Sequence, residues 1–344
     1  MGRVVLVTGV SRYLGGRFAR LLQGDPAVDR VIGVDVVAPR WDIGSAEFVR
    51  ADIRNPIIAK VIAQAEVDTV VHMSVIATPL GAGGRTTMKE INVIGTMQLL
   101  AACQKAQTVE RLVVKSSASV YGSSGKDPAL FTEDMEPKRL PRSGFAKDSV
   151  EVEGYVRGFA RRRPDVDVTL LRFANFISPR IETPLTSYFA LPVLPTPIGY
   201  DARLQFVHED DGLEVMRIPT VGSAPGTFNV AGDGVILLSQ AARRAGRLVV
   251  PVPAPAGGWV GQLFRRVGLA DFSPEQMAFL SHGRAVDCSR LRETLGYTPR
   301  YTTVEAFDDF VRGRRMITPL PRERVAEVER RLLAALPQGR PGSG

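Results

Sequence analysis

The 344-residue sequence is poor in cysteine, in lysine and in long apolar runs. Its two cysteines, Cys103 and Cys288, are too few for a disulfide framework or a zinc cluster, so we expect no metal site. No apolar run reaches the roughly 20 residues that a membrane helix needs. The N-terminus enters a strand pattern at once and lacks a signal-peptide layout. These absences argue against secreted and membrane-spanning proteins, and we expect a cytoplasmic one.

Positive charge comes almost entirely from arginine, with 44 basic residues against 36 acidic ones and a net charge of +8. Arginines at 161–163 and between Arg312 and Arg331 could form a face that binds polyanions. They also fit solvated helix surface, which we favour because no nucleic-acid module or interleaved aromatic residues accompany them. We therefore do not expect a nucleic-acid partner.

Short β-branched runs alternate with longer helical patterns in the first half of the chain. Strands are expected over 3–8, 30–35, 46–52, 68–74, 111–117 and 167–173, and helices over 14–23, 55–64, 88–105 and 143–163. This alternation predicts an α/β fold with a Rossmann-type, doubly wound parallel sheet. We assign residues 1–175 to this dinucleotide-binding domain and allow later segments to return to it.

The rhythm changes after residue 175. Residues 177–197 are rich in proline, and the later pieces are short: strands at 205–208 and 227–231, and helices near 236–245, 259–282 and 303–313. We expect residues 176–336 to form a smaller substrate lobe over the carboxyl edge of the sheet, where open α/β folds bind ligands. The tail 337–344 has the composition of a disordered segment.

A glycine-containing loop, T-G-V-S-R-Y-L-G, joins the first expected strand to the first helix. Gly9 permits the tight turn, Gly15 permits close packing of helix on strand, and the N–H groups that begin the helix can bind a pyrophosphate. Asp35 ends the second strand, where a carboxylate binds ribose hydroxyls and repels a 2′-phosphate. Arg12 replaces the usual middle glycine; it could pair with phosphate or point outward. We predict a dinucleotide site that takes NAD in preference to NADP.

Further short motifs follow along the chain. They are D-I at 52–53, N-V-I-G-T at 92–96, S-S-A-S-V-Y-G at 116–122, L-R-F-A-N-F-I-S-P at 171–179, F-V-H-E-D-D at 206–211, V-D at 286–287 and L-G-Y-T-P at 295–299. Their order and spacing over residues 3–311 resemble the extended short-chain dehydrogenase/reductases of the NAD-dependent epimerase/dehydratase family. The sequence looks most similar to UDP-glucose 4-epimerase-like members.

The resemblance implies an NAD-dependent oxidoreductase or isomerase whose small-molecule substrate is a nucleotide sugar. The implied cofactor contacts are Gly9, Arg12, Tyr13, Leu14, Gly15, Asp35, Asp52, Ile53, Met73, Ser74, Asn92 and Lys147. The implied substrate contacts are Ser117, Tyr121, Asn175 and Arg203. The family also implies a homodimer formed through the helices at 88–105 and 143–163.

The family's catalytic set is a serine, a tyrosine, and a lysine four residues after the tyrosine. Ser117 and Lys147 match the serine and the lysine, but Ser143 stands at the tyrosine position. A serine hydroxyl ends roughly 4 Å closer to the backbone than a phenol does, and it has no comparable base form. The resemblance therefore assigns catalysis to Ser117, Lys147 and Ser143, with altered acid–base chemistry.

Other groups could replace the phenol. Tyr155 lies about 12 Å further along the helix than Lys147, which is too far. Tyr121 could line the pocket, and a water held by Ser143 and Lys147 is another option. His72 and His208 fit structural roles better than catalytic ones. The alternative to an enzyme is a non-catalytic NAD(H)-binding sensor or scaffold protein.

Overall fold

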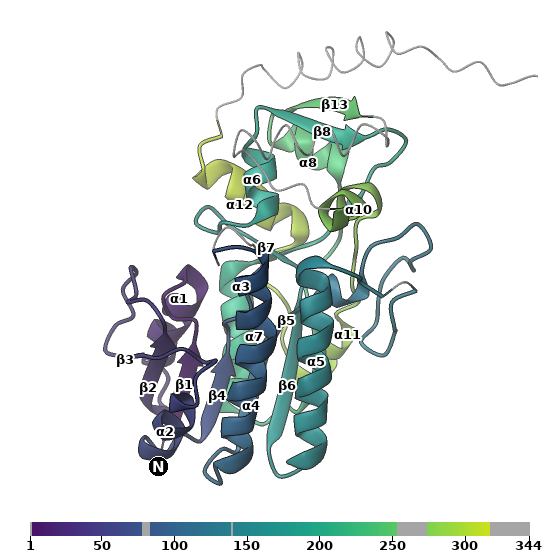
Figure 1. Ribbon diagram of the computed structural model, residues 1–344. Coiled ribbons are helices and arrows are strands. Elements are labelled where there is room, and N and C mark those ends of the chain that lie inside the picture. The colour runs from purple at the N-terminus through teal and green to yellow at the C-terminus, as the bar shows by residue number, and fades with distance from the viewer. Residues whose placement is uncertain (1, 78–82, 139, 253–273, 317–344) are drawn as a thin grey trace, which may run out of the picture.

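A computed structural model describes residues 2–77, 83–138, 140–252 and 274–316. Its centre is a seven-stranded parallel sheet in the order β11-β6-β5-β4-β1-β2-β3 (Figure 1). The strands are β1 (Arg3–Thr8), β2 (Val28–Asp35), β3 (Glu47–Arg50), β4 (Thr69–His72), β5 (Arg111–Ser117), β6 (Asp167–Phe173) and β11 (Gly226–Val230). The predicted Rossmann-type α/β fold is confirmed.

Helices cover both faces of the sheet. On one face pack α2 (Ile57–Gln64), α4 (Thr96–Lys105) and α5 (Gly144–Arg162), and on the other α1 (Tyr13–Leu22), α7 (Glu209–Val221) and α11 (Ser289–Leu295). The first strand shows why: Val5 and Val7 enter the core under α1, whereas Leu6 enters the core under α2. A strand that is apolar on both sides needs cover on both faces.

The expected helix over 88–105 consists of three consecutive pieces. They are α3 (Arg85–Lys89), the π-helical η2 (Glu90–Gly95) and α4. A short 3₁₀ turn, η3 (Ala118–Tyr121), follows β5. The π-helical turn contains Asn92, so the irregular backbone falls on the N-V-I-G-T motif.

Three elements after residue 175 lie with the sheet, namely α7, β11 and α11, which packs against β11. The α7 helix packs against β5 and β6, and β11 pairs with β6 at the edge of the sheet. The α7 helix lies outside the helices expected from the sequence, and it contains Pro219 in its last turn. His208 begins the helix by accepting a hydrogen bond from the Asp210 N–H, 3.2 Å away.

The remaining later elements form a lobe above the carboxyl ends of the strands (Figure 1). They are β7 (Asn175–Ile177), α6 (Pro184–Ala190), β8 (Val193–Pro197), β9 (Arg203–Leu204), β10 (Phe206–His208), β12 (Ile236–Leu237), α8 (Leu238–Arg244), β13 (Leu248–Val252), α10 (Pro274–His282) and α12 (Thr303–Gly313). Aromatic side chains, among them Tyr188, Phe189 and Phe307, fill the lobe's own core. Most of the helical pattern expected near 259–282, and the tail 337–344, lie outside the described residues.

Across the described ranges, no helix is long and apolar enough to cross a membrane. In the same ranges, no cluster of three or more His, Cys, Asp or Glu residues could hold a metal ion.

Candidate active site

A cleft of about 1510 Å³ opens between the carboxyl ends of the strands and the lobe. The glycine loop and the end of β2 line one part of it. The ends of β4 and β5, the start of α5, residues 179–185 and the start of α10 line the rest. The cleft therefore lies where the topology of an open α/β sheet places a ligand site.

The glycine loop has the geometry of a dinucleotide cradle. Gly9 has a φ of +82°, and a Cβ there would lie 3.2 Å from the Ser74 nitrogen. A Cβ at Gly15 would overlap the Gly9 carbonyl oxygen, so the helix approaches the loop as closely as glycine allows. Arg12 is the N-cap of α1 but makes no side-chain capping bond, which leaves the first N–H groups of the helix for a ligand.

The Asp35 carboxylate lies at the end of β2 beside this loop. Its Oδ2 accepts a hydrogen bond from the Ser11 N–H at 3.0 Å, and its Oδ1 accepts one from the Val36 N–H at 2.8 Å. Burial in the cleft lowers the pKa of Arg12, while the charge of Asp35 opposes that shift. The loop thus holds the acid in the place where a dinucleotide's adenosine ribose would lie.

Ten of the expected cofactor residues line the cleft: Gly9, Arg12, Tyr13, Leu14, Gly15, Asp35, Asp52, Ile53, Met73 and Ser74. The cleft lining does not include Asn92 or Lys147. Asn92 is fully buried, and its amide bonds both the N–H and the C=O of Ile76, at 2.7 and 2.9 Å. This side chain therefore shapes the segment after β4.

The helix that should carry the catalytic tyrosine and lysine begins at the cleft. Ser143 is the N-cap of α5 and lines the cleft. Lys147, one turn later, points its ammonium to Glu151, with 3.8 Å between Nζ and Oε1 and 44% of the side chain exposed. Ser117 lines the cleft, and its Oγ accepts a hydrogen bond from the Ser119 N–H at 3.1 Å. Ser117 and Ser143 thus lie in the cleft, whereas Lys147 is turned toward Glu151.

A carboxylate from the lobe occupies the region in front of Ser143. The Ser143 hydroxyl donates to Glu275 Oε1 over 3.2 Å, and Glu275 also lines the cleft. Gly144 has a φ of +65°, and a Cβ there would overlap Glu275 Oε2. Burial raises the pKa of Glu275, against the opposing effects of Ser143, the Ala146 N–H and Arg85. The pair Ser143–Gly144 therefore makes room for Glu275, which the sequence could not reveal because 132 residues separate the two partners.

A lysine outside the expected site residues also lines the cleft. Lys115 is two residues before Ser117 on β5 and lies over the ring of Phe176, with 5.8 Å from Nζ to the ring centroid. Burial, and to a smaller extent the charge of Arg12, lower the pKa of Lys115 to about 8. The signal was available, since a lysine near the end of a buried parallel strand is unusual.

Of the expected substrate residues, Ser117 and Asn175 line the cleft, whereas Tyr121 and Arg203 are not part of its lining. Arg203 donates to the Pro128 carbonyl at 3.3 Å. Tyr121 is 1% exposed and belongs to a buried network behind the cleft. Both side chains thus lie outside the cleft lining, and their role as substrate contacts stays a prediction.

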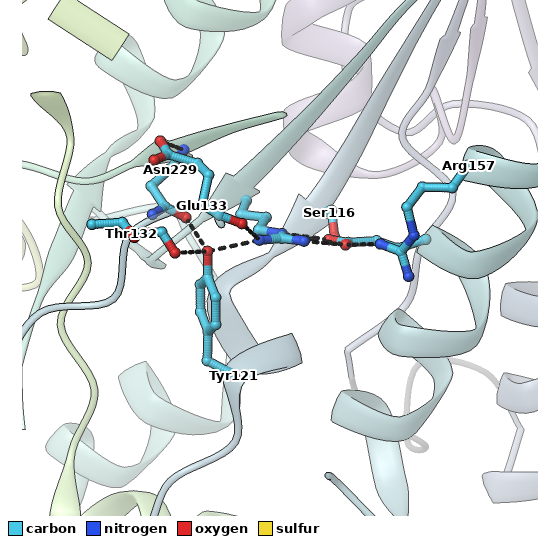
Figure 2. A network of polar contacts seen from close by, with 8 residues as sticks. Ser116, Tyr121, Thr132, Glu133, Arg157 and Asn229 are labelled. Atoms are coloured by element: carbon cyan, nitrogen blue, oxygen red, sulfur yellow. Dashed lines mark hydrogen bonds and ion pairs between the residues drawn. The ribbon is translucent and has the colours of Figure 1, made fainter. Parts of the chain in front are cut away.

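That network joins β5, β6 and α5 (Figure 2). The Tyr121 hydroxyl points toward Asn229 Oδ1 at 2.9 Å and accepts a hydrogen bond from Arg172 at 2.7 Å. Arg172 in turn pairs with Glu153 on α5 at 2.7 Å, and Ser116 donates to Glu153 at 2.6 Å. The network therefore fixes the strand residue that directly precedes Ser117.

Both histidines that the sequence raised as candidates serve the structure. His72 is buried between the hydroxyls of Thr8 and Thr96, each 2.9 Å away, and burial lowers its pKa to about 4. His208 caps α7 and stacks on Tyr301, with 3.9 Å between ring centroids.

Comparison with known proteins agrees with this geometry. The profile of the NAD dependent epimerase/dehydratase family matches residues 5–217. An uncharacterized protein of Mycobacterium tuberculosis is 51% identical over 334 residues, which cover 96% of this chain and 89% of that protein.

Two solved structures have the same fold. The UDP-glucose 4-epimerase of Thermotoga maritima with UDP-glucose has a TM-score of 0.69 at 19% identity, covering 91% of this chain and 98% of that one. The dTDP-glucose 4,6-dehydratase of Streptomyces venezuelae with NAD has a TM-score of 0.68 at 23% identity, covering 91% and 97%. The fold, the glycine loop and these matches together show that the chain belongs to the NAD-dependent epimerase/dehydratase family.

Proposed function

We propose that the chain binds NAD in this cleft and oxidises, reduces or isomerises a nucleotide sugar, with acid–base chemistry that differs from the family pattern. The observation that carries the proposal is one continuous cleft from the glycine loop and Asp35 to Ser117, Ser143 and Glu275. The two structural neighbours bind UDP-glucose and NAD respectively, which supports the choice of ligand class.

Glu275 is our candidate for the missing proton acceptor. Among the described residues, Tyr13 is the one tyrosine in the cleft lining, and it packs edge-on against Trp41 beside the glycine loop. Glu275 instead faces the cleft from the start of α10, where Ser143 and the Ala146 N–H orient its carboxylate. A raised pKa brings a carboxylate closer to the range in which general bases work.

Bound NAD would supply a hydride acceptor for a substrate carbon. Ser117 would hold the oxygen on that carbon by a hydrogen bond. Glu275 would take the proton of the same hydroxyl onto a carboxylate oxygen and return it when the carbonyl is reduced again. The burial of Glu275 favours that protonated form, which is the direction in which its pKa is shifted.

We predict that Asp35→Asn weakens NAD binding about tenfold to a hundredfold, because hydrogen bonds to a charged group contribute about 1.5–3 kcal/mol. Isothermal titration of the full-length chain with NAD and NADP measures the effect. The affinity for NADP should fall less than that for NAD, because the substitution also removes the charge that repels the 2′-phosphate. Asp165→Asn, on an exposed carboxylate that binds Arg163, is the matched control. Equal NAD affinities in all three proteins would contradict the assignment of Asp35.

We also propose a homodimer formed through η2, α4 and α5. Ile94 and Met97 are 46% and 42% exposed on the first two elements, and Tyr155 is 39% exposed on α5. Exposed apolar side chains gathered on neighbouring helices are typical of a protein interface.

Met97→Glu should therefore convert the dimer to a monomer, because it places a charge in the apolar contact. Light scattering after size-exclusion chromatography measures the mass. Met135→Glu is the control, since Met135 has the same 42% exposure outside these helices. A wild-type protein that is monomeric at micromolar concentration would refute the dimer.

A further inference from the structure

Lys115 places a cation inside the cleft on the same side of the sheet as Ser117. Side chains alternate along β5, and the intervening Ser116 points to the opposite face, where it donates to Glu153 on α5 at 2.6 Å. Two residues along a strand span about 7 Å. Lys115 therefore lies within about that distance of the residue expected to hold the reacting oxygen.

The surroundings of Lys115 do not neutralise it. Within the described residues, no carboxylate oxygen lies within 4.0 Å of its ammonium. The charge that acts on its pKa, besides burial, is that of Arg12 from the loop before α1. His72 on β4 is kept neutral by burial, which lowers its pKa to about 4. The α7 helix packs against β5, but its Glu209 and Asp210 bind Arg17, at 2.9 and 3.0 Å. The Phe176 ring on β7 lies beneath the ammonium, with 5.8 Å from Nζ to the ring centroid.

We propose that Lys115 makes this cleft bind the reduced, neutral nicotinamide ring more tightly than the oxidised, positively charged one. The proposal rests on NAD binding as proposed above. With the ring beside Ser117, as proposed, a separation of about 7 Å between two unit positive charges at an effective dielectric constant of about 20 would change affinity about tenfold to a hundredfold. Lys147, which the family resemblance assigns to the nicotinamide side, pairs with Glu151 instead. A cleft with this bias would hold the reduced cofactor while an oxidised sugar intermediate waits for the hydride to return.

The preference for the reduced ring should weaken as the pH rises through about 8. The pKa of Lys115 is about 8, so its charge is present below that pH and is lost above it. Arg12 stays charged through this range and His72 stays neutral, since its pKa is about 4. Affinity for NAD⁺ should therefore rise as the pH passes through about 8, whereas affinity for NADH should change little.

Isothermal titration of the full-length protein with NAD⁺, NADH and ADP-ribose tests the proposal, at pH values from about 7 to about 9. Lys115→Met should raise the NAD⁺ affinity about tenfold or more relative to NADH and remove the pH dependence. Lys115→Arg should keep the bias and lose its pH dependence. Lys105→Met, an exposed lysine at the end of α4, is the control. ADP-ribose, which lacks the ring, should bind equally to all variants.

Three results would overturn the proposal. If NAD⁺ and NADH both bind and Lys115→Met leaves their affinity ratio unchanged, Lys115 does not act on the ring, although NAD binding stands. If ADP-ribose binding weakens in step with the other ligands, Lys115 binds phosphate instead. If no dinucleotide binds the wild-type protein, the proposal of NAD binding and the proposal about Lys115 are both refuted. Should Lys115→Met fail to fold, the pH series on the wild type and on Lys115→Arg still decides the matter.

Discussion

Replacing Glu275 by glutamine should slow turnover about 10²–10⁴-fold, which is the usual contribution of a positioned acid–base group. The amide keeps the size of the side chain and can still accept the Ser143 hydrogen bond, but it cannot take up a proton. Dinucleotide binding should remain, because Glu275 bonds to Ser143 and the Ala146 N–H at the start of α5 and makes no described contact with the glycine loop. The measurement is a single-turnover experiment that follows NADH absorbance after NAD-loaded protein is mixed with UDP-glucose or dTDP-glucose.

Two comparisons make this result specific. Glu293→Gln removes an exposed carboxylate on α11 and should leave the rate unchanged. The wild-type rate should rise with pH through a value above the ordinary glutamate pKa, because burial shifts the pKa of Glu275 upward. A Glu275→Gln protein that turns over as fast as the wild type would eliminate Glu275 as the proton acceptor. Tight NAD binding without turnover by the wild type would favour a non-catalytic NAD(H)-binding protein.

The largest expected effect on stability concerns the buried network behind Ser117. Glu153→Ala should lower the free energy of unfolding by about 3–5 kcal/mol, because it leaves the Arg172 guanidinium buried without its carboxylate. Glu153 is 1% exposed and Arg172 8% exposed, so water cannot replace the lost partner. Urea denaturation monitored by circular dichroism measures the change.

Arg157→Ala is the matched control for this network. Arg157 binds the same carboxylate at 3.1 Å, but its side chain is 52% exposed. A pair with one partner this exposed contributes at most about 1 kcal/mol. If Glu153→Ala and Arg157→Ala lower the free energy of unfolding equally, burial does not determine the strength of this network.

Local patterns predicted the sheet and the glycine loop at its carboxyl edge because those features depend on residues close in sequence. The run from Arg3 to Thr8 forms β1 with the expected bounds, and β5 and β6 also begin and end where the periodicity placed them. Gly9, Gly15 and Asp35 are joined by one strand–helix–strand unit, so spacing alone fixes their relation. The tail and part of the expected helical region near 259–282 lie outside the described residues.

The end of the cleft that holds Ser117, Ser143 and Glu275 could not be predicted in the same way. Glu275 reaches Ser143 from a different lobe, and neither residue type at its own position signals the contact. Lys147 follows the family spacing, yet the helix offers it Glu151 one turn later, and its ammonium lies there. The sequence makes Tyr121 a candidate for the pocket, but its hydroxyl is hydrogen-bonded to the buried Arg172 and Asn229. Motif spacing places a residue on an element, whereas packing decides which side chains face the cleft.

The most direct test of the account is a crystal structure of the full-length chain grown with NADH and UDP-glucose. We predict a dinucleotide whose adenosine ribose binds Asp35, whose pyrophosphate lies on the start of α1, and whose nicotinamide lies beside Ser117 and Lys115. The sugar should lie between Ser117 and Glu275. A glycine loop filled by the Arg12 side chain, with no dinucleotide in the cleft at saturating NADH, would contradict the account.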